Sequence, residues 1–566
     1  MRKNILPLIF ILAITIVLSL PLLKPGLHTI HDDQQIARLY LFDEAIKSGQ
    51  FPVRWVDDLG FGFGYPLFNF YPPFVYMLGE IFHIVGFTFI DSIKLVFFSS
   101  IIASGLFMYL LAKELWGRWP ATISATFYML VPYRALDIYV RGALAESFAF
   151  VWLPAILWSF YKLETTKKRV YIVTSAMFLA LLMITHNLIF LPFMLLFPFY
   201  LLFLFLKSKD KKRSFILYTS SAILALGTSA FFWLPAIFEK RYTIVDQLLL
   251  VNLASYQIHF VYLQQLWNWT WGFGGSSVGL TDGISFKIGK LHLLASFAAL
   301  ILSTFYIIKN KKISLWPILF FILMIIAAFM TTQYSKIAWD NITPLGYLQF
   351  PWRFLIFTAL FSSLLAGALV YLLRISILKI SIGVILILLL VPNLKLYRPQ
   401  SYRNGLTDQV ATSREEIRWN VSKTSYEYLP KGIDLVKDEK GINIPQVDRN
   451  NIPKQKVEVI EGNAKFEDIK GSPTEVTFTS RSNEGAQIKA NIFNFPGWEV
   501  KLNGQKISID DNNALKLITF EVPAGESKVD IEFKQTGLRL AANLISLFAI
   551  FSLITLTVTK WQPKKF

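Results

Sequence analysis

Long apolar runs, separated by short polar segments, fill most of the first 394 residues of the chain. Runs of about 18 to 22 residues have the length that a helix needs to cross a bilayer core. The ten-residue alternating segments typical of a transmembrane barrel are missing there. A less apolar run at 74–90 contains Glu80 and His83, which predicts a helix at the membrane surface rather than a span. We therefore predict about twelve spanning helices, at residues 4–23, 92–113, 117–132, 146–163, 169–185, 187–207, 214–238, 291–309, 313–331, 350–372, 377–394 and 538–559.

A different pattern begins near residue 395, where polar and apolar residues alternate in short runs between Gly, Asn and Pro turns. This alternation predicts β-strands, and Asn503-Gly504 between two such runs predicts a tight hairpin. We expect residues 395–537 to form an outward β-sandwich. The chain then comprises a helical membrane domain (1–394, with a first outer loop at 24–91), this β-rich domain, and a final helix with a basic tail (538–566).

Composition and charge agree with a polytopic membrane protein. Of the 566 residues, 54% are hydrophobic, and the mean hydropathy is +0.47. The net charge of +18 comes largely from short loops between apolar runs, so the positive-inside rule explains it without a nucleic-acid partner. Twelve spans place these basic loops on one side, which predicts cytoplasmic termini in the plasma membrane and outward segments at 24–91, 132–146, 239–290, 332–349 and 395–537. The first apolar run is too long for a signal peptide, so we expect a retained helix.

Asp32 and Asp33 follow the first predicted span on its outer side. A carboxylate pair there can act as a general base, bind a divalent cation such as Mg or Mn, or cap the helix predicted to follow. His28 and His31 lie nearby, but no compact spacing of three or four ligands follows, which disfavours zinc.

Charged residues also gather in the other outward segments. In the loop at 132–146, Arg141 is placed to meet an anion, and Glu146 lies at the mouth of a buried helix, where a carboxylate is costly. The alternative for this loop is a helical pair of Asp137 with Arg141. Guanidinium groups bind phosphate in a bidentate manner, whereas the alternative for arginines at span ends is contact with lipid headgroups. The candidate binding residues are Arg38, Arg54, Arg134, Arg141, His186, Arg241 and Arg353, with a structural hydrogen bond as the alternative for His186.

Five stretches that occur in order resemble bacterial membrane proteins classed as 6-pyruvoyl-tetrahydropterin synthase-related. They are "HDDQQIARLYLFDEAIKSGQFPVRWVDDLGFGFGYPLFNFYPP", "PYRALDIYVRGALAE", "THNLI", "WGFGGSSVGLTDGISFKIG" and "LQFPWRFL". The soluble pterin enzyme uses a zinc site of three histidines, and nothing in the chain supplies such a site in a comparable domain. The architecture resembles instead the GT-C glycosyltransferase superfamily and the related YfhO-like membrane proteins.

This resemblance implies a GT-C-like fold of about twelve spans and an inverting glycosyltransferase. Its donor would be a polyprenyl-phosphate sugar and its acceptor a component of the cell envelope, on the outer face of the membrane. Asp32 or Asp33 would act as the base or metal-assisted activator, with Glu146 as a supporting carboxylate. The chain has neither GxxxxGK[ST] nor a Rossmann GxGxxG after a strand, which suits a lipid-linked donor. The alternatives are a flippase for lipid-linked glycans, which the nearly uncharged middles of the spans disfavour, and a non-catalytic assembly protein.

Overall fold

A computed structural model describes residues 5–249, 255–309, 314–437, 439 and 443–558. All twelve predicted spans are helical in it, and eight of the described helices are long and apolar enough to cross a membrane. These are α1 with η2 (Ile5–Leu23), α5 (Phe89–Trp116), α8 (Leu144–Thr166), α10 (Asn187–Lys207), α15 (Lys290–Ile308), η7 with α19 (Pro351–Leu372), α20 with η8 (Ser376–Leu396) and α22 (Gly537–Val558). The predicted polytopic helical fold is confirmed.

The four remaining predicted spans depart from single long helices. Three are shorter: α6 (Arg118–Met129), α9 (Val170–Thr185) and α16 (Trp316–Met330). The fourth is broken into α11 (Lys211–Thr228) and α12 (Ala230–Phe238), which are bent by 69°. At the break, the Ser229 hydroxyl donates a hydrogen bond to the Ala225 carbonyl oxygen, and Gly227 leaves room for Ala549 of α22. The length of an apolar run does not show whether the helix bends within it. Such a bent helix pair is either one broken span or a re-entrant loop, so the number of spans stays a prediction.

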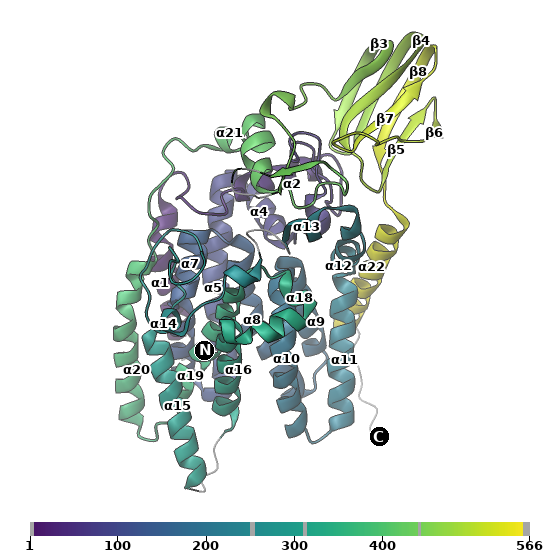
Figure 1. The fold of residues 1–566 in the computed structure, drawn as a ribbon. Helices are drawn as coiled ribbons and strands as arrows, with labels where there is room; N and C mark the ends of the chain where they lie inside the picture. Colours follow the sequence, from purple (N-terminus) through teal and green to yellow (C-terminus); the bar gives the residue numbers. More distant parts are fainter. Residues whose placement is uncertain (1–4, 250–254, 310–313, 438, 440–442, 559–566) are drawn as a thin grey trace.

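The helices form a bundle with α8 and α19 at its centre (Figure 1). In each of these two helices 89% of the apolar window is buried, whereas only 17% of α20 and 22% of α22 is buried. Large apolar side chains such as Phe548 and Phe551 on α22 are therefore exposed on the outside of the bundle. An apolar exterior around a packed centre is what a helix bundle in lipid requires.

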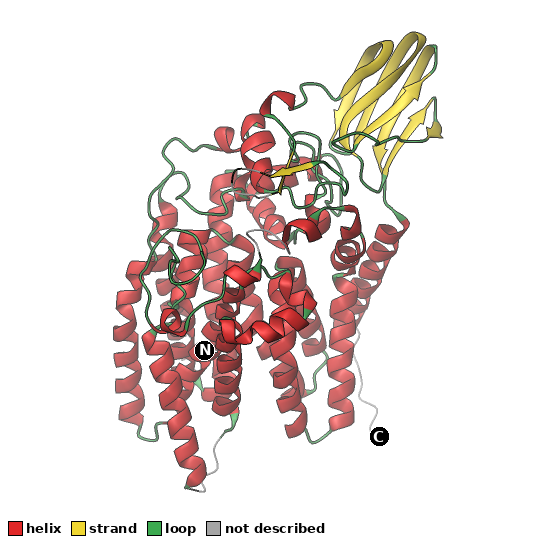
Figure 2. Ribbon diagram, viewed as in Figure 1, coloured by secondary structure: helices red, strands yellow, loops and turns green. Residues whose placement is uncertain are grey.

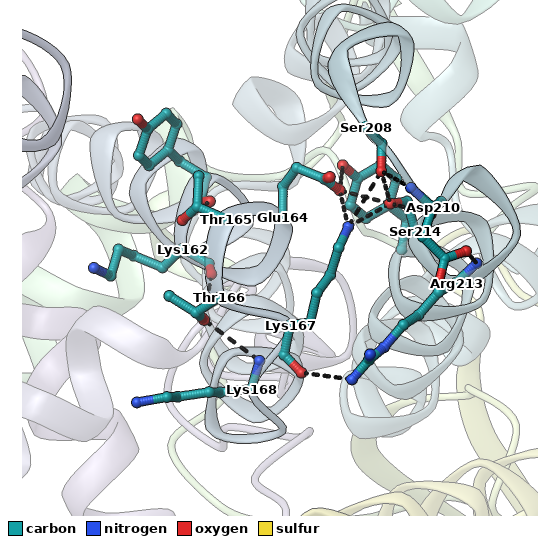
Figure 3. Close-up of polar contacts among 12 residues, drawn as sticks. Lys162, Glu164, Thr165, Thr166, Lys167, Lys168, Ser208, Asp210, Arg213 and Ser214 are labelled. Carbon is teal, nitrogen blue, oxygen red and sulfur yellow. Dashed lines mark hydrogen bonds and ion pairs between the residues drawn. The ribbon is translucent and has the colours of Figure 1, made fainter. Parts of the chain in front are cut away.

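Basic residues cluster at the end of the bundle away from the sheet domain. There the α10–α11 turn lies beside the end of α8 (Figure 3), where Glu164 forms an ion pair with Lys167 at 2.6 Å. The Glu164 carboxylate also accepts hydrogen bonds from Ser214 and Tyr218 of α11. This network joins α8 to α11 at the end that the sequence predicts to be cytoplasmic.

Short helices connect the spans at their other ends. They are α2 (Gln35–Lys47), α3 (Leu67–Phe70), α4 (Phe74–Ile84), α7 (Pro132–Leu136), η3 (Asp137–Arg141), η4 (Lys240–Tyr242), α13 (Val245–Leu249), η5 (Tyr256–Ile258), α14 (Leu263–Trp267), η6 (Gln333–Ser335), α17 (Lys336–Asn341), α18 (Thr343–Gly346), α21 (Asp408–Ala411), η9 (Glu416–Val421) and η10 (Ser422–Thr424). The predicted surface helix is α4, which has 11 residues and exposes Ile81 and Ile84. The glycine-rich stretch of the first loop packs closely, because a Cβ at Gly64 would lie 2.4 Å from the Trp55 ring.

A pair of carboxyl groups between α2 and α4 makes stability depend on pH. Glu80 is buried near Asp43, and this burial, followed by the Asp43 charge, raises the pKa of Glu80 to about 7. The pKa of Glu80 in the folded state lies above its unfolded-state value of 4.5, so the protonated carboxyl group stabilises the folded state at pH values below 4.5. This stabilisation disappears as the pH rises through about 7. At pH 8 we expect Glu80→Gln to raise the thermal midpoint by a few degrees and to flatten its pH dependence. Glu44→Gln, on the exposed side of α2, is the matched control, and an unchanged pH profile in Glu80→Gln contradicts the assignment.

Residues 395–434, which the sequence groups with the β-rich domain, pack on the membrane domain instead. The Asp408 carboxylate accepts hydrogen bonds from the backbone N–H groups of Phe89 and Ile90 and so caps α5. Tyr402 forms a backbone bridge with His28 of the first loop. This part of the chain therefore covers the helix ends before the sheet domain begins.

The sheet domain lies beyond the helix ends (Figure 2). A small sheet pairs β1 (Leu435–Lys437) with β2 (Asn443–Pro445), and the turn η11 (Arg449–Asn451) follows. The main antiparallel sheet has the order β3-β4-β8-β5-β6, with β7 also on β4; its strands are β3 (Val457–Ser472), β4 (Glu475–Phe493), β5 (Trp498–Leu502), β6 (Gln505–Ile507), β7 (Leu517–Val522) and β8 (Gly525–Phe533). The predicted β-rich domain is confirmed, but its six main strands belong to one sheet rather than to the two of the predicted sandwich, because β4 pairs with β3, β7 and β8, and β8 continues to β5 and β6. The predicted hairpin joins β5 to β6 through Asn503 and Gly504, both with positive φ.

Candidate functional site

A cavity of about 940 Å³ lies among the helix ends, between the first loop, the end of α12 and residues 423–428. Its walls come from segments that are far apart in the sequence: α2, η3, the α9–α10 turn, the start of η7 and η10 with the residues after it. Of the residues predicted to form a site, five line it: Asp32, Arg38, Arg141, His186 and Arg353.

Glu146, in the first turn of α8, lies buried beneath these residues and contacts three of them. Its carboxylate is 2.9 Å from Arg141, 3.7 Å from Arg353 and 4.0 Å from His186. Tyr133 donates a hydrogen bond to the other carboxylate oxygen at 2.5 Å. Negative charge is favoured at a helix N-terminus. Glu146 thus holds two guanidinium groups at the cavity, which places the predicted supporting carboxylate behind the site rather than on its surface.

The local backbone aims Arg141 into the cavity. Residues Asp137–Arg141 form the π turn η3, and Gly142 ends it with φ +67°. A Cβ at Gly142 would lie 2.4 Å from the Ile30 side chain, so only glycine fits there. Arg141 also pairs with Asp137 at 2.5 Å. The two alternatives predicted for this loop are therefore compatible: Arg141 forms an ion pair with Asp137 and also lines the cavity.

The two adjacent aspartates have different environments. The backbone N–H groups of His31 and Asp32 donate to the carbonyl oxygens of Val140 and Arg141, which places Asp32 beside Arg141 at the cavity. Asp33 points away and pairs with Arg403 at 3.2 Å, where its side chain is 47% exposed. Neither carboxylate caps α2, because the N-cap is Gln34 and it has no side-chain cap bond. Among the described residues, the Asp32 carboxylate has no hydrogen bond or ion pair and is free to meet a substrate.

His186 forms the turn between α9 and α10 and serves as a structural cap as well as a cavity residue. Its Nδ1 accepts a hydrogen bond from the backbone N–H of Ile189 at 3.2 Å. Burial is the main cause that lowers the pKa of His186 to about 3, although the Glu146 carboxylate opposes it. The imidazole is therefore neutral at physiological pH and presents an Nε2–H toward Glu146.

Arg38 lines the opposite wall, on the first turn of α2. Its guanidinium donates to the Ser425 hydroxyl at 3.0 Å and lies over the Tyr71 ring at 4.3 Å. It is thus fixed by a hydrogen bond and by a cation–π contact.

The other three predicted arginines lie outside the cavity. Arg54 is buried and donates to Asn69, to the Phe231 carbonyl and to Asn543, so it ties the first loop to α12 and α22. Arg134 is buried against the Phe150 ring and donates to Ser104. Arg241 is exposed and contacts Tyr242. Arg54 and Arg134 therefore hold buried parts of the fold together and do not belong to the candidate phosphate site.

The two aspartates that could bind a divalent cation do not share one site, and the use of a cation stays a prediction. Asp33 faces Arg403 outside the cavity, so Asp32 lines the cavity without it. Within the described part of the chain, no group of three or more His, Asp or Glu side chains is arranged to hold a metal ion. The residues present do not fit a Mg or Mn site built on both aspartates, and positive charge at the cavity comes from arginine and lysine.

Several cavity residues escape sequence reasoning. Lys240 donates to Tyr347 at 2.7 Å, and both line the cavity. Lys423, Tyr426, Glu427 and Tyr428 come from the segment that was predicted to be part of the sandwich. Burial raises the pKa of Glu427, and the charge of Arg38 opposes that rise. No local motif marks these residues, because the cavity joins distant segments: Lys240 meets Tyr347 across 107 positions, and Tyr428 meets Tyr65 across 363.

One wall of the cavity is apolar and reaches the outside of the bundle. It is lined by Leu188 of α10, Ala236 and Ile237 of α12, and Leu248 of α13. Ile237 lines the cavity although 54% of its surface is exposed, and the adjoining Phe238 is exposed to 53%. The cavity thus has a polar floor and an apolar side next to the lipid-facing surface.

Comparison with known proteins gives partial structural similarity only. No protein-family model matches the sequence, and no curated protein matches it. The archaeal oligosaccharyltransferase AglB from Archaeoglobus fulgidus, in complex with an inhibitory peptide and a dolichol-phosphate, is 12% identical with a TM-score of 0.47 over 72% of this chain and 56% of its own. The arabinofuranosyltransferase AftD from Mycobacteria is 12% identical with a TM-score of 0.43 over 69% of this chain and 26% of its own. The chain spans about half of the first protein and a quarter of the second, and membership of the GT-C superfamily stays a prediction.

Proposed function

We propose that the chain is a membrane glycosyltransferase that transfers a sugar from a polyprenyl-phosphate donor to an acceptor of the cell envelope. The strongest support for this function is that three features occur together in one cavity. These are the free carboxylate of Asp32, the guanidinium groups of Arg141 and Arg353, and an apolar wall that reaches the lipid-facing surface. A lipid phosphate needs both a hydrocarbon surface for its chain and bidentate donors for its head.

The reaction follows from this arrangement. The donor phosphate binds Arg141 and Arg353, and the polyprenyl chain lies along Ile237 and the rest of the apolar wall. The acceptor oxygen forms a bond to the anomeric carbon while Asp32 takes its proton. The bond from the anomeric carbon to the phosphate oxygen breaks, and the polyprenyl phosphate leaves with the electron pair, stabilised by the guanidinium groups. A single displacement inverts the anomeric centre.

The cavity end of the bundle is proposed to face outward, with both termini in the cytoplasm. The supporting observation is the cluster of basic residues at the other end, which includes Lys167, Lys168 and Arg213 (Figure 3). The sheet domain then lies outside the plasma membrane. A lipid-linked donor is the form of activated sugar available there.

Transfer and transport are separated by one experiment on the purified full chain in proteoliposomes. We expect radiolabelled sugar to move from polyprenyl phosphate to envelope material, with release of the unglycosylated lipid phosphate. The assay is run over a panel of lipid-linked sugars, with heat-denatured protein as the control. Movement of the intact lipid-linked sugar between leaflets, with no transfer at any panel member, overturns the proposal in favour of a flippase.

A further inference from the structure

Three consecutive residues of the segment after η10 line the cavity: Tyr426, Glu427 and Tyr428. Glu427 and Tyr428 lie in a turn, so the three neighbours are not held to the alternation of an extended strand, and all three line the cavity. They lie on the wall that also carries Arg38 and Tyr71, whereas Arg141 and Arg353 surround Glu146 on the floor.

This wall is held in place from several directions. The Tyr428 backbone N–H donates to the Tyr65 hydroxyl at 2.8 Å, and the Tyr426 hydroxyl donates to the Asn443 carbonyl at 3.2 Å. The Ile244 N–H donates to the Leu429 carbonyl oxygen, which ties the segment to the start of α13. The Tyr428 ring stacks on Phe70 with centroids 4.9 Å apart. A binding surface needs such support to keep its geometry.

The chemistry of the wall differs from that of the phosphate floor. The Glu427 carboxylate, which the Tyr65 hydroxyl also contacts, keeps acceptor capacity for a ligand hydroxyl group, and tyrosine rings offer apolar surface with a polar edge. A pyranose has the matching features, with hydroxyl groups around its rim and C–H groups on its faces. The Glu427 carboxylate and the Arg38 guanidinium carry opposite charges on the same wall, so an acceptor without a net charge fits it best.

We propose that Tyr426, Glu427 and Tyr428 form a subsite for the acceptor and that this acceptor is a neutral carbohydrate. The inference rests on the proposed glycosyltransferase function and adds the substrate class to it. Asp32 lies on the same cavity, so an acceptor hydroxyl held at this wall has a carboxylate available to take its proton.

The test uses the full chain in detergent micelles and a panel of methyl glycosides of hexoses, N-acetylhexosamines and pentoses. Binding is followed by saturation-transfer difference NMR. We expect at least one glycoside to bind the wild type and about tenfold weaker binding in Glu427→Gln, because a hydrogen bond to a charged group is lost. Glu415→Gln, whose side chain is 67% exposed outside the cavity, is the matched control. The subsite is overturned if no glycoside binds the wild type, or if Glu427→Gln binds as well as the control.

A second measurement separates this inference from the proposed function. Unglycosylated polyprenyl phosphate is added to the same samples, and its binding is followed as a rise in thermal midpoint. Glu427→Gln should keep this rise, which also shows that the variant folds, while Arg353→Gln should lose it and still bind glycoside. Glycoside binding without lipid-phosphate binding overturns the proposed function and leaves a carbohydrate-binding site without an acceptor role, and the reverse result overturns the subsite alone.

Discussion

Replacing Asp32 with asparagine should reduce sugar transfer by at least about a hundredfold, whereas the same change at Asp33 should leave most of the activity. Asp32 lines the cavity beside Arg141 and has a free carboxylate, while Asp33 faces Arg403. Asparagine has nearly the shape of aspartate but cannot take a proton from the acceptor. The expected loss therefore falls on kcat rather than on lipid binding.

The measurement is the initial rate of transfer from a radiolabelled polyprenyl-phosphate sugar, with variants matched for membrane insertion and thermal midpoint. Asp33→Asn is the internal control, since it alters a carboxylate one position away and outside the cavity. Equal losses in the two variants, or full activity in Asp32→Asn, contradict the assignment of Asp32 as the base. Retained polyprenyl-phosphate binding in Asp32→Asn separates a lost base from a lost binding site.

The sequence predicts the helices well because a membrane imposes a simple rule on them. A span needs a long apolar run, and every predicted run is helical. The rule does not report how a helix bends, so the break between α11 and α12 at Ser229 is seen only in the structure. The Asn503-Gly504 hairpin was predictable for a similar reason, since the turn is specified by two adjacent residues.

The candidate site could be predicted only in part from the sequence. Whether a charged side chain lines the cavity depends on its burial and on the direction in which it points. Asp32 and Asp33 are equivalent in sequence, yet the backbone bonds of His31 and Asp32 to η3 place Asp32 at the cavity, whereas Asp33 lies in the following turn and pairs with Arg403. Arg134 and Arg141 share one motif, but the π turn directs Arg141 to the cavity while Arg134 packs on Phe150. Local spacing cannot distinguish a guanidinium that binds a ligand from one that fills a polar gap in the core.

The cavity wall at residues 423–428 was beyond sequence reasoning altogether. Arg38 meets Ser425 across 387 positions of the chain. Period-2 alternation further along predicts that the whole stretch from 395 belongs to the sheet domain, although residues 395–434 pack on the helix ends. A contact of this range has no local signature, so the second carboxylate of the cavity, Glu427, appears only when the chain is folded.

Glu146→Gln should reduce both stability and lipid-phosphate binding, because it removes the charge that holds Arg141 and Arg353. Both arginines and Glu146 are buried, with the carboxylate fully inaccessible. Removing one partner from a buried charge network typically costs about 3–5 kcal/mol, since the remaining charges lose their compensation. A glutamine keeps the size of the side chain, so the loss reports charge rather than a cavity.

The check on Glu146 compares thermal midpoints with and without polyprenyl phosphate. Glu164→Gln is the control, because Glu164 also organises a charge network, but at the other end of the bundle (Figure 3). Both variants should unfold at lower temperature, yet only Glu146→Gln should lose the rise in midpoint that the lipid phosphate produces. An unchanged rise in Glu146→Gln would show that the two guanidinium groups do not bind the phosphate. Loss of transfer with normal stability and normal lipid binding would instead make Glu146 a direct participant in the reaction.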